Sequence, residues 1–377
     1  MPFSEPDLAP LLDTLARSAA ERDKEDGHAA AQKQALADAG LLGLSIPERF
    51  GGDELPWSRL LQVVRTVARD DSALAHLLAF HHLQVATLLI YGTQEQQARW
   101  LEPTVRLRQW WGNAVNPRDE RLRAIASPEG YRLEGEKRYC SGTLGSACMT
   151  VSARDADGAI VLGVVATAQH GITVREDWDA IGQRQTDSGS HFDAVRLARA
   201  DVLRAPDTPP SVRHTVRTCL GQLILVNLYA GLAEGALAEA RSLMAEGGIP
   251  TDAAVRAPLL GRLGDGHVRA VTATVMADRA GAQFDVLWQA GEAVVPQHRA
   301  EAAVAIAEAK VVAHRASLHL GEALFDIGGA RATRGALGLD RFWRNARTHT
   351  LHDPLDQKLA ALGRWSLEGE FPPGFYQ

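Results

Sequence analysis

Apolar residues recur at helical spacing through the first hundred residues of the chain. A first stripe consists of four leucines: Leu8, Leu11, Leu12 and Leu15. Residues 29–39 form a second amphipathic unit, which Gly40 ends, and residues 57–70 and 72–91 continue the same period. This section is therefore expected to contain helices and no strands.

The period changes to alternation between Trp110 and about Leu203. The predicted strands are residues 131–139, 149–154, 159–166, 172–174 and 192–197. Asp155-Ala-Asp-Gly158 joins two of them as a hairpin. Because no helical stripe separates these runs, we expect an antiparallel sheet or a small barrel.

Helical spacing returns after the proline-rich linker at residues 205–210. Four helices are predicted, over residues 212–244, 256–290, 298–325 and 353–367. Their short connections predict an antiparallel four-helix bundle. The first helix is nearly uncharged from Leu220 to Leu232, which predicts burial there and also suggests a contact with another subunit. The expected fold class is mainly α with a central antiparallel β-domain, divided into residues 1–108, 109–204 and 211–377.

Composition narrows the class of protein. The chain has 377 residues, of which 46% are hydrophobic and 23% charged, as in an ordinary globular protein. The 46 acidic and 40 basic residues give a formal net charge of -6, which argues against a nucleic-acid partner. The three cysteines fit neither a disulfide framework nor a metal-binding spacing, so we expect a cytoplasmic location. We recognise no signal peptide and no run approaching the ~20 apolar residues of a membrane span.

The segment 340–354 carries the densest chemistry in the chain. It reads Asp-Arg-Phe-Trp-Arg-Asn-Ala-Arg-Thr-His-Thr-Leu-His-Asp-Pro. At helical spacing its arginines share one face, while Phe342 and Trp343 are expected to anchor the segment in a core. His349 and His352 repeat the spacing of three, and Pro354 should end the helix close to His352. Imidazoles at such a boundary are suited to acid–base chemistry near neutral pH.

Simpler interpretations of this segment stay open. Arginines at helical spacing are also typical of a solvated face or of structural ion pairs, and a histidine pair can cap a helix end. A metal site built from His349, His352 and Asp353 is a weaker alternative, because no further ligands recur at suitable spacing.

The predicted sheet contains two polar stretches that suit a ligand. Residues 139–146 place the Ser141 hydroxyl among glycines, and residues 178–190 combine the Trp178 indole with several hydrogen-bond donors. Each stretch is also typical of an ordinary strand end or surface loop. His81, on a predicted apolar helix, is by itself more typical of a core histidine.

Several motifs resemble the acyl-CoA dehydrogenase superfamily, whose layout is helical part, β-domain and helical bundle in that order. Gly43-Leu-Ser-Ile-Pro-Glu-Arg-Phe-Gly-Gly52 looks like its N-terminal signature. Within the superfamily the chain most resembles the reduced-flavin monooxygenase branch typified by dibenzothiophene monooxygenase. The matching segments are Phe80-His81, Trp111-Gly-Asn-Ala114, Tyr139-Cys-Ser-Gly142, Trp178-Asp-Ala-Ile-Gly182, Arg184-Gln-Thr-Asp-Ser-Gly189 and residues 341–354.

The resemblance implies oxygen chemistry on a flavin. Reduced FMN from a separate flavin reductase is expected to react with dioxygen to a flavin hydroperoxide, which oxygenates a small organic substrate, organosulfur or aromatic. Such a species needs a cavity closed to bulk solvent and hydrogen bonds to its oxygens. By match to the family, this catalytic role falls to His352, His81, Ser141 and Asn113. The resemblance further implies a homotetramer.

The resemblance also implies a set of cofactor-binding residues. Trp178, Thr186 and Ser188 are expected to line the isoalloxazine, and Arg331 is expected to meet its polar edge or phosphate. His349 and Asp353 complete the set.

One segment departs from the monooxygenase pattern. Where the family carries an arginine-containing segment that holds the flavin phosphate, this chain has Leu243-Met-Ala-Glu-Gly-Gly248. Either Arg241 or Arg256 substitutes, or FMN binds weakly as a diffusing substrate, or the flavin has been lost.

Two other functions stay open beside the monooxygenase. The first is an acyl-CoA dehydrogenase with tightly bound FAD, although His352 stands about where many dehydrogenases carry a catalytic glutamate. The second is a flavin-free binding or scaffold protein of the same fold.

Overall fold

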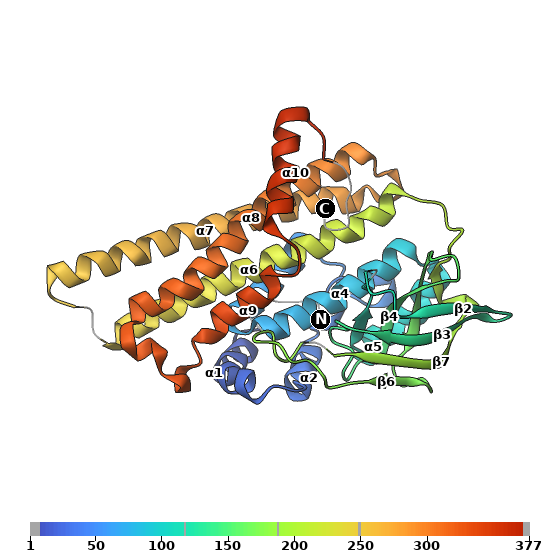
Figure 1. Cartoon of the computed structure of the whole chain (residues 1–377), viewed down its shortest axis with the longest axis horizontal. Coiled ribbons are helices and arrows are strands. Elements are labelled where there is room, and N and C mark those ends of the chain that lie inside the picture. Colours follow the sequence, from blue (N-terminus) through green and yellow to red (C-terminus); the bar gives the residue numbers. More distant parts are fainter. Residues whose placement is uncertain (1–7, 117, 187, 248–249, 372–377) are drawn as a thin grey trace.

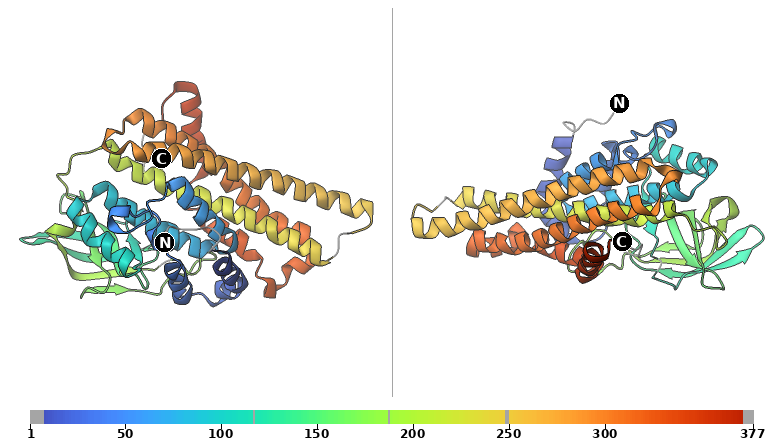
Figure 2. Two further views of the ribbon diagram at one scale, coloured as in Figure 1. Left: turned by 180° about the vertical axis from the view of Figure 1, so that it is seen from behind. Right: turned by 90° about the horizontal axis from the view of Figure 1, so that it is seen from above.

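The computed structural model describes residues 8–371 apart from residues 117, 187, 248 and 249. Helices form both ends of the chain and a sheet lies between them in sequence, which confirms the predicted layout (Figure 1). The sheet occupies one end of the molecule, and the long C-terminal helices extend away from it (Figure 2). The division into three domains with the boundaries given above stays a prediction.

The described part of the N-terminal section is helical, as predicted. Its helices are α1 (Ala9–Glu25), α2 (Ala30–Asp38), α3 (Trp57–Asp70), α4 (Ser72–Tyr91) and α5 (Gln94–Arg106), with 3-10 turns at Leu41–Gly43 and Glu48–Phe50. Asp71 separates α3 from α4, because its side chain accepts a hydrogen bond of 2.9 Å from the Leu74 amide and so caps α4. Thr93 and Gln96 form a capping box that begins α5.

The central section forms one mixed sheet. Its strands among the described residues are β1 (Trp111–Ala114), β2 (Arg123–Ser127), β3 (Gly130–Lys137), β4 (Cys148–Arg154), β5 (Ile160–Ala166), β6 (Ile172–Val174), β7 (Ser190–Ala198) and β8 (Val202–Arg204). They lie in the order β6-β7-β3-β2-β4-β5-β8, and β1 pairs with β4. The predicted hairpin joins β4 and β5.

The direction of β1 differs from the expectation of an antiparallel sheet. Most neighbouring strands are antiparallel, but β1 runs parallel to β4, and β2 also pairs with β4 in parallel. All four residues of β1 are buried, so the strand has no alternation of apolar and polar positions by which to recognise it.

The C-terminal section is dominated by three long helices. They are α6 (Val212–Gly247), α7 (Ala253–Gln289) and α8 (Pro296–Gly328), followed by the shorter α9 (Asp340–Thr350) and α10 (Leu355–Glu368). The apolar centre of α6 is buried, as predicted, because it packs against α3, α4, α7 and α8. The predicted fourth helix exists as α10, but it packs against α8 and points away from the long axis of the bundle (Figure 1).

Two helices have the length and apolar composition that a membrane span needs. These are Ser72–Tyr91 and Val212–Gly247 among the described residues. They resemble membrane spans in length and composition only. In the apolar windows of the two helices, 89% and 83% of the residues are buried inside the molecule. This burial is what central core helices require.

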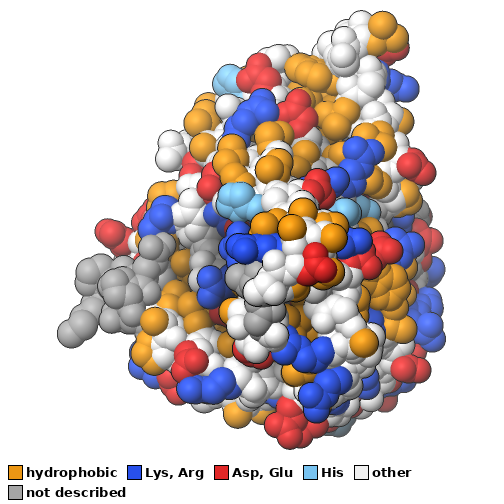
Figure 3. All heavy atoms as spheres, turned by 90° about the vertical axis from the view of Figure 1, so that its left-hand side faces the viewer, with side chains coloured by type: hydrophobic (Ala, Val, Ile, Leu, Met, Phe, Trp, Pro, Cys, Tyr) orange, Lys and Arg blue, Asp and Glu red, His pale blue; other side chains and the backbone are white. Residues whose placement is uncertain are grey.

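The end of the molecule opposite the sheet carries a mixed surface. Basic and acidic side chains are interspersed with apolar ones on this face (Figure 3). No single charge dominates the visible part of it.

Candidate active site

Helix α9 presents its arginines to carboxylates rather than to solvent alone. Arg341 donates to Glu239 at 3.1 Å, and Arg344 donates to Asp340 at 2.8 Å and also pairs with Asp23. The structural ion-pair interpretation therefore accounts for these two arginines. Phe342 is buried in the core as predicted.

The prediction that Trp343 anchors α9 in the core is wrong. The Trp343 side chain is 39% exposed, because the backbone of α9 approaches α8 too closely at this position for an inward-pointing indole. A Cβ added to Gly321 on α8 would lie 2.9 Å from the Trp343 Cα atom. Gly321 thus allows the two helix backbones to pack together.

His352 follows the last turn of α9 and faces the outside of the chain. The helix ends at Thr350, and the His352 amide donates to the His349 carbonyl at 3.0 Å in the turn that follows. The imidazole is 46% exposed, so in the single chain the expected cavity closed to solvent does not enclose it. Its Nδ1 atom lies 3.3 Å from Asp353 Oδ1.

The His349 ring contacts another histidine, His76. Its Nε2 atom lies 2.9 Å from Nδ1 of His76 on α4, and the two rings are enclosed. His76 also stacks on Phe80 with ring centroids 4.0 Å apart. Burial lowers the pKa of His76 to about 3 and that of His349 well below its usual range, so both rings are neutral at pH 7. In this structure the His349 ring contacts His76, and its predicted cofactor contact stays a prediction.

Asp353 is buried under two lysines. Its side chain is 1% exposed, pairs with Lys310 of α8, and has Lys358 of α10 at 3.9 Å. Lys310 also donates to Gln222 at 2.7 Å. These side chains cover the carboxylate, and the cofactor contact of Asp353 stays a prediction.

His81 is a structural residue. Its ring is 0% exposed, Nε2 donates to the Leu42 carbonyl at 3.0 Å, and Nδ1 accepts a hydrogen bond of 3.1 Å from the Trp111 amide. Burial lowers its pKa to about 4, so the ring is neutral. Both nitrogens bond to backbone groups, which supports the simpler interpretation of a core histidine, and the catalytic role of His81 stays a prediction.

Asn113 and Ser141 lie together beside α4. The Asn113 amide donates to the Ser141 carbonyl at 2.9 Å, so β1 and the residue 139–146 stretch are adjacent. Asn113 follows Trp111 by two residues, and His81 fixes Trp111 to α4. The structure therefore brings these two predicted residues together beside α4.

Tyr139 and Trp178 form an aromatic shelf next to Ser141. Their ring centroids are 5.8 Å apart in an edge-to-face arrangement, and the Tyr139 side chain is 57% exposed. The Trp178 indole N–H donates to the Gln183 carbonyl at 2.9 Å, which holds the ring in place. The shelf offers ring faces rather than donors to a planar ligand.

Thr186 and Ser188 organise their own loop instead of pointing at the shelf. The Thr186 hydroxyl donates to the Gln183 carbonyl at 2.7 Å, and the Ser188 hydroxyl lies 2.5 Å from that of Thr143. Both residues border a small recess on the side of α2, where Lys33 donates to the carbonyls of Gly142, at 3.3 Å, and Leu144. In the single chain both hydroxyls therefore bond within the protein, and their predicted contact with the isoalloxazine stays a prediction.

Helix α9 and the residue 178–190 loop are tightly joined. Asn345 accepts a hydrogen bond of 2.6 Å from the Gln183 amide, and Arg344 donates to the Ile181 carbonyl at 2.6 Å. A Cβ on Gly182 would lie only 2.3 Å from the Arg344 carbonyl oxygen. Glycine is therefore needed at position 182, and the shelf is fixed in relation to α9.

Arg331 lies next to the C-terminal end of α6. It follows α8 in the 3-10 turn Gly329–Thr333 and donates to the Leu243 carbonyl near the end of α6. A Cβ on Gly247 would lie 3.1 Å from its guanidinium. Arg331 thus supplies a cation to the segment that lacks the family's arginine, of which Gly248 lies outside the described residues. This place is at the end of the bundle away from the sheet (Figure 1).

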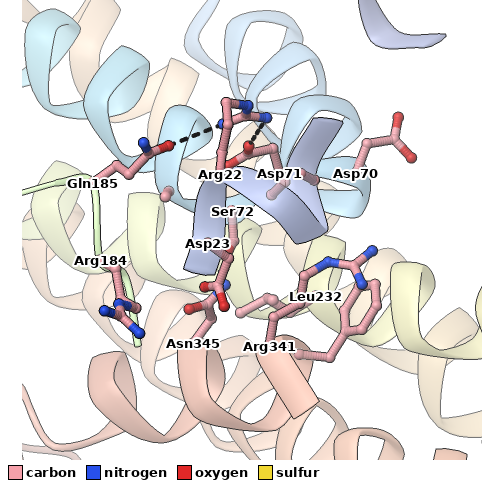
Figure 4. Close-up of a pocket in the computed structure, with 14 residues that line it drawn as sticks. Arg22, Asp23, Asp70, Asp71, Ser72, Arg184, Gln185, Leu232, Arg341 and Asn345 are labelled. Atoms are coloured by element: carbon pink, nitrogen blue, oxygen red, sulfur yellow. Dashed lines mark hydrogen bonds and ion pairs between the residues drawn. The ribbon is translucent and has the colours of Figure 1, made fainter. Parts of the chain in front are cut away.

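A second hollow lies apart from the aromatic shelf, since neither Tyr139 nor Trp178 lines it. It has an empty volume of about 370 Å³, including open solvent, and lies between α1, α9 and the start of α4. Charged side chains cross it, and Arg22 pairs with Asp71 at 2.5 Å and donates to Gln185 at 3.1 Å (Figure 4). None of the predicted site residues lines this cleft.

The metal alternative gains no support from geometry. Among the described residues, no group of three or more His, Cys, Asp or Glu side chains is arranged to hold an ion. His349, His352 and Asp353 instead point in different directions, toward His76, the surface and Lys310.

Three residues that contact the predicted site residues were not predicted from the sequence: His76, Lys310 and Lys358. Lys310 had a usable signal, since it is the single lysine of α8 and stands between the apolar residues Ala309 and Val311. A charged residue in such a run is typical of a buried pair. His76 had only its position four residues before Phe80 on an apolar helix.

The chain is similar to known proteins along its whole length. Residues 11–108 match the family model for the acyl-CoA dehydrogenase N-terminal domain, and residues 223–357 match that for the C-terminal domain. The chain is 39% identical over 377 residues to the probable FMNH2-dependent monooxygenase SfnC of Pseudomonas putida, covering 97% of this chain and 95% of the relative.

Solved structures show the same relationship. Methanesulfinate monooxygenase MsuC from Pseudomonas fluorescens superimposes with a TM-score of 0.94 at 38% identity, over 98% of each chain. FMN-bound TdsC from Paenibacillus sp. A11-2, a dibenzothiophene monooxygenase, superimposes with a TM-score of 0.92 at 32% identity, again over 98% of each chain.

Proposed function

The chain belongs to the acyl-CoA dehydrogenase family, and because its full-length relatives are FMNH2-dependent monooxygenases, we propose that it is a two-component flavin-dependent monooxygenase. It takes reduced FMN from a separate flavin reductase and uses dioxygen to oxygenate a small organosulfur compound. The observation that carries this proposal is the similarity to SfnC over 97% of the chain. The family resemblance stated from the sequence is confirmed.

The residues around the shelf fit a planar flavin. Tyr139 and Trp178 offer aromatic faces, while Ser141 and Asn113 place polar groups beside them. Bound reduced FMN supplies the activation of dioxygen for transfer to the substrate. The chain itself positions the ring, and the half-exposed imidazole of His352 holds or delivers a proton at a nitrogen atom. A neutral imidazole donates at one nitrogen and accepts at the other, which suits this role.

The dehydrogenase alternative lacks its base at the corresponding place. Proton abstraction next to a carbonyl requires an accessible carboxylate whose pKa is near the working pH. Asp353 is the adjacent carboxylate, but it is buried against Lys310. Burial alone would raise its pKa, but the hydrogen bond from His352 and the charge of Lys310 outweigh burial and lower that pKa to about 2. Such a carboxylate is a poor base, so the monooxygenase is the better assignment.

We place the flavin reductase, the cytoplasmic location and a homotetramer within the same proposal. Arg331 supports an oligomer, because it lies at the end of the bundle away from the shelf and can serve the phosphate of the same FMN only from another copy of the chain (Figure 1). Helix α7 adds an exposed apolar stripe made of Val268, Val271 and Val275. Cys148 and Cys219 are buried free thiols, as in a reducing compartment. Light scattering at several concentrations tests the tetramer.

Anaerobic titration with FMN tests the cofactor assignment. We expect reduced FMN to bind and to raise the melting temperature more than oxidised FMN does, because the reduced form is the substrate in a two-component system. Binding by neither form would support the flavin-free protein. A permanently bound FAD that an acyl-CoA reduces would support the dehydrogenase.

Turnover assays test the reaction. With a flavin reductase, NADH and FMN, we expect oxygenation of at least one member of a panel containing methanesulfinate, dibenzothiophene and indole. These compounds represent a small anion, a flat sulfur heterocycle and a nitrogen heterocycle. Which one reacts defines the substrate class.

A further inference from the structure

A continuous chain of contacts runs from the bundle core to His352. Lys310, in the middle of α8, pairs with Oδ1 of Asp353, and the same oxygen lies 3.3 Å from Nδ1 of His352. Gln222 of α6 accepts a hydrogen bond of 2.7 Å from Lys310 and fixes the inner end of the chain. Only His352 among these residues is exposed.

The Asp353 carboxylate is held in its charged form. Burial alone would raise its pKa, but the hydrogen bond from His352 and the charges of Lys310 and Lys358 lower that pKa to about 2. Burial lowers the pKa of Lys358 to about 7, so near neutral pH this lysine is only partly charged, and burial also lowers the pKa of Lys310 against the opposing effect of Asp353. Breaking such a buried pair is costly, which keeps the carboxylate in one position.

A fixed carboxylate selects one tautomer of the adjacent imidazole. A charged carboxylate accepts hydrogen bonds but donates none, so Nδ1 of His352 must carry a proton to bond with it. The Nε2 atom lies on the other side of the ring and is the nitrogen that Asp353 does not engage. In the neutral ring Nε2 therefore has the lone pair, and it gains a proton only when the ring becomes an imidazolium.

We propose that Asp353 is a positioning residue, whose carboxylate, held by Lys310, accepts a hydrogen bond from Nδ1–H of His352 and leaves Nε2 as the nitrogen that exchanges a proton during oxygen transfer. This inference rests on the proposed monooxygenase function, since it assigns the partner of the residue that serves that reaction. It replaces the cofactor contact expected of Asp353. Asp353 itself remains ionised, and the proton that His352 exchanges with the ligand is exchanged at Nε2.

Other titratable groups surround this pair and contribute to its field. They come from every element packed against it: Tyr229 of α6, His76 of α4, His314 and Lys310 of α8, Arg347 and His349 of α9, and Lys358 of α10. Of these, His76 and His349 are neutral at pH 7 because they are buried. The Asp353 carboxylate lies 3.3 Å from Nδ1 of His352, so neutralising Asp353 removes a negative charge from beside the ring.

The first test replaces Asp353 by asparagine, which keeps the size but removes the charge. The side-chain amide introduced by this change can donate to Nδ1 and so favours the opposite tautomer. We expect Asp353→Asn to lower oxygenated product by about 10²-fold or more while reduced FMN still binds. The ratio of product to hydrogen peroxide should also change its pH profile, because the imidazole loses its anionic partner.

A matched control separates positioning from general destabilisation. Asp71→Asn neutralises another buried aspartate, which pairs with Arg22 and caps α4. We expect this variant to lose stability without moving the pH midpoint. If Asp353→Asn binds reduced FMN and keeps both the wild-type product yield and the wild-type pH midpoint, the inference is wrong.

A double-variant cycle tests whether Asp353 acts through His352. In a His352→Gln background there is no imidazole to orient, so adding Asp353→Asn should cause no further loss of product. Independent, multiplying losses from the two changes would contradict the inference. This comparison remains informative when both single variants are less stable than wild type, because it is made at equal concentrations of reduced FMN complex.

The unchanged protein provides a test that needs no turnover. Histidine labelled with ¹⁵N reports the tautomer of each ring, and His352→Gln identifies the signal of position 352. We expect the Nδ1–H form in the wild-type protein and its loss in Asp353→Asn. An Nε2–H form in the wild type would overturn the inference. Failure to bind reduced FMN would instead count against the proposed function.

Discussion

The chemistry of a histidine in this chain is decided by what its two nitrogens meet. His81 and His352 both belong to motifs that resemble the monooxygenase branch, yet His81 bonds to two backbone groups and His352 is half exposed. Sequence reasoning placed both in one catalytic set, because motif residues carry no information about the direction of a side chain. The apolar surroundings of His81 were the signal that favoured a core role.

Replacing His352 by alanine tests its role directly. We expect reduced FMN to bind but oxygenated product to fall by about 10²-fold, with hydrogen peroxide released in its place, because the proton donor and acceptor is lost. His170→Ala is a suitable control, since that histidine is exposed in the turn after β5. Equal product-to-peroxide ratios in the two variants would contradict the assignment.

Replacing His81 by alanine tests the structural role. The Leu42 carbonyl and the Trp111 amide would both lose their partner in a buried place. We expect the free energy of unfolding to fall by about 3 kcal/mol or more, measured by urea denaturation. A stability loss below about 0.5 kcal/mol together with abolished oxygen transfer would restore the catalytic interpretation.

Whole elements with a clear apolar period were predictable. The bounds expected for α3 and α4 agree with the structure, because both helices are strongly patterned and Asp71 marks the break between them. By contrast β1 was missed, since a fully buried strand of four residues has no alternation. The fixed position of the shelf loop depends on Asn345 and Gly182, and this contact lies between segments about 160 residues apart, which local patterns do not encode.

A substitution at Gly182 tests the joint between the shelf loop and α9. An alanine Cβ would lie 2.3 Å from the Arg344 carbonyl oxygen, so the loop must move away. We expect Gly182→Ala to weaken reduced FMN binding by about tenfold or more and to destabilise the fold by about 1–3 kcal/mol. Calorimetric titration and thermal unfolding measure the two effects.

Gly261→Ala is the matched control for this prediction. Gly261 lies within α7, and an added Cβ would meet nothing within 4 Å. The change should stabilise the helix by about 0.5–1 kcal/mol and leave FMN binding unchanged. Unaltered FMN binding in Gly182→Ala would show that the joint does not position the flavin site.

The three sections of the molecule meet at α4, and this meeting was only partly predictable. Family resemblance gave the order of the sections and indicated Asn113, Ser141 and His352, which the structure places around α4 and the end of α9. It did not indicate Lys310, because the Lys310–Asp353 pair appears only when α8 and α9 pack side by side. The role predicted for Arg331 stays a prediction, and its separation from the sheet becomes visible only in the assembled fold, where it lies next to the end of α6 (Figure 1).

The buried histidines make the stability of the whole molecule depend on pH. Burial lowers the pKa of His76 to about 3 and of His81 to about 4, whereas an unfolded chain titrates its imidazoles near 6.5. Below pH 6.5 the unfolded state binds protons that the folded state does not accept. The free energy of unfolding should therefore decrease as the pH is lowered. These two residues contribute a decrease of up to about 2.7 kcal/mol per pH unit between about pH 6 and pH 4.

Denaturant titrations at about pH 7, 6 and 5 check this pH dependence. His81→Ala should show a shallower slope than the wild-type protein, because one of the two contributions is gone. A stability that stays constant between about pH 7 and 5 would contradict the neutral, buried state of both rings.

The origin of the transferred oxygen atom tests the central claim most directly. The chain, a flavin reductase, NADH and FMN are incubated under ¹⁸O₂ with each compound of the panel, and the products are analysed by mass spectrometry. A flavin-dependent monooxygenase incorporates one heavy oxygen atom into an organosulfur product, and omission of the reductase abolishes this product. Consumption of reduced FMN with hydrogen peroxide as the sole product for every compound, or product oxygen derived from water, would contradict the account.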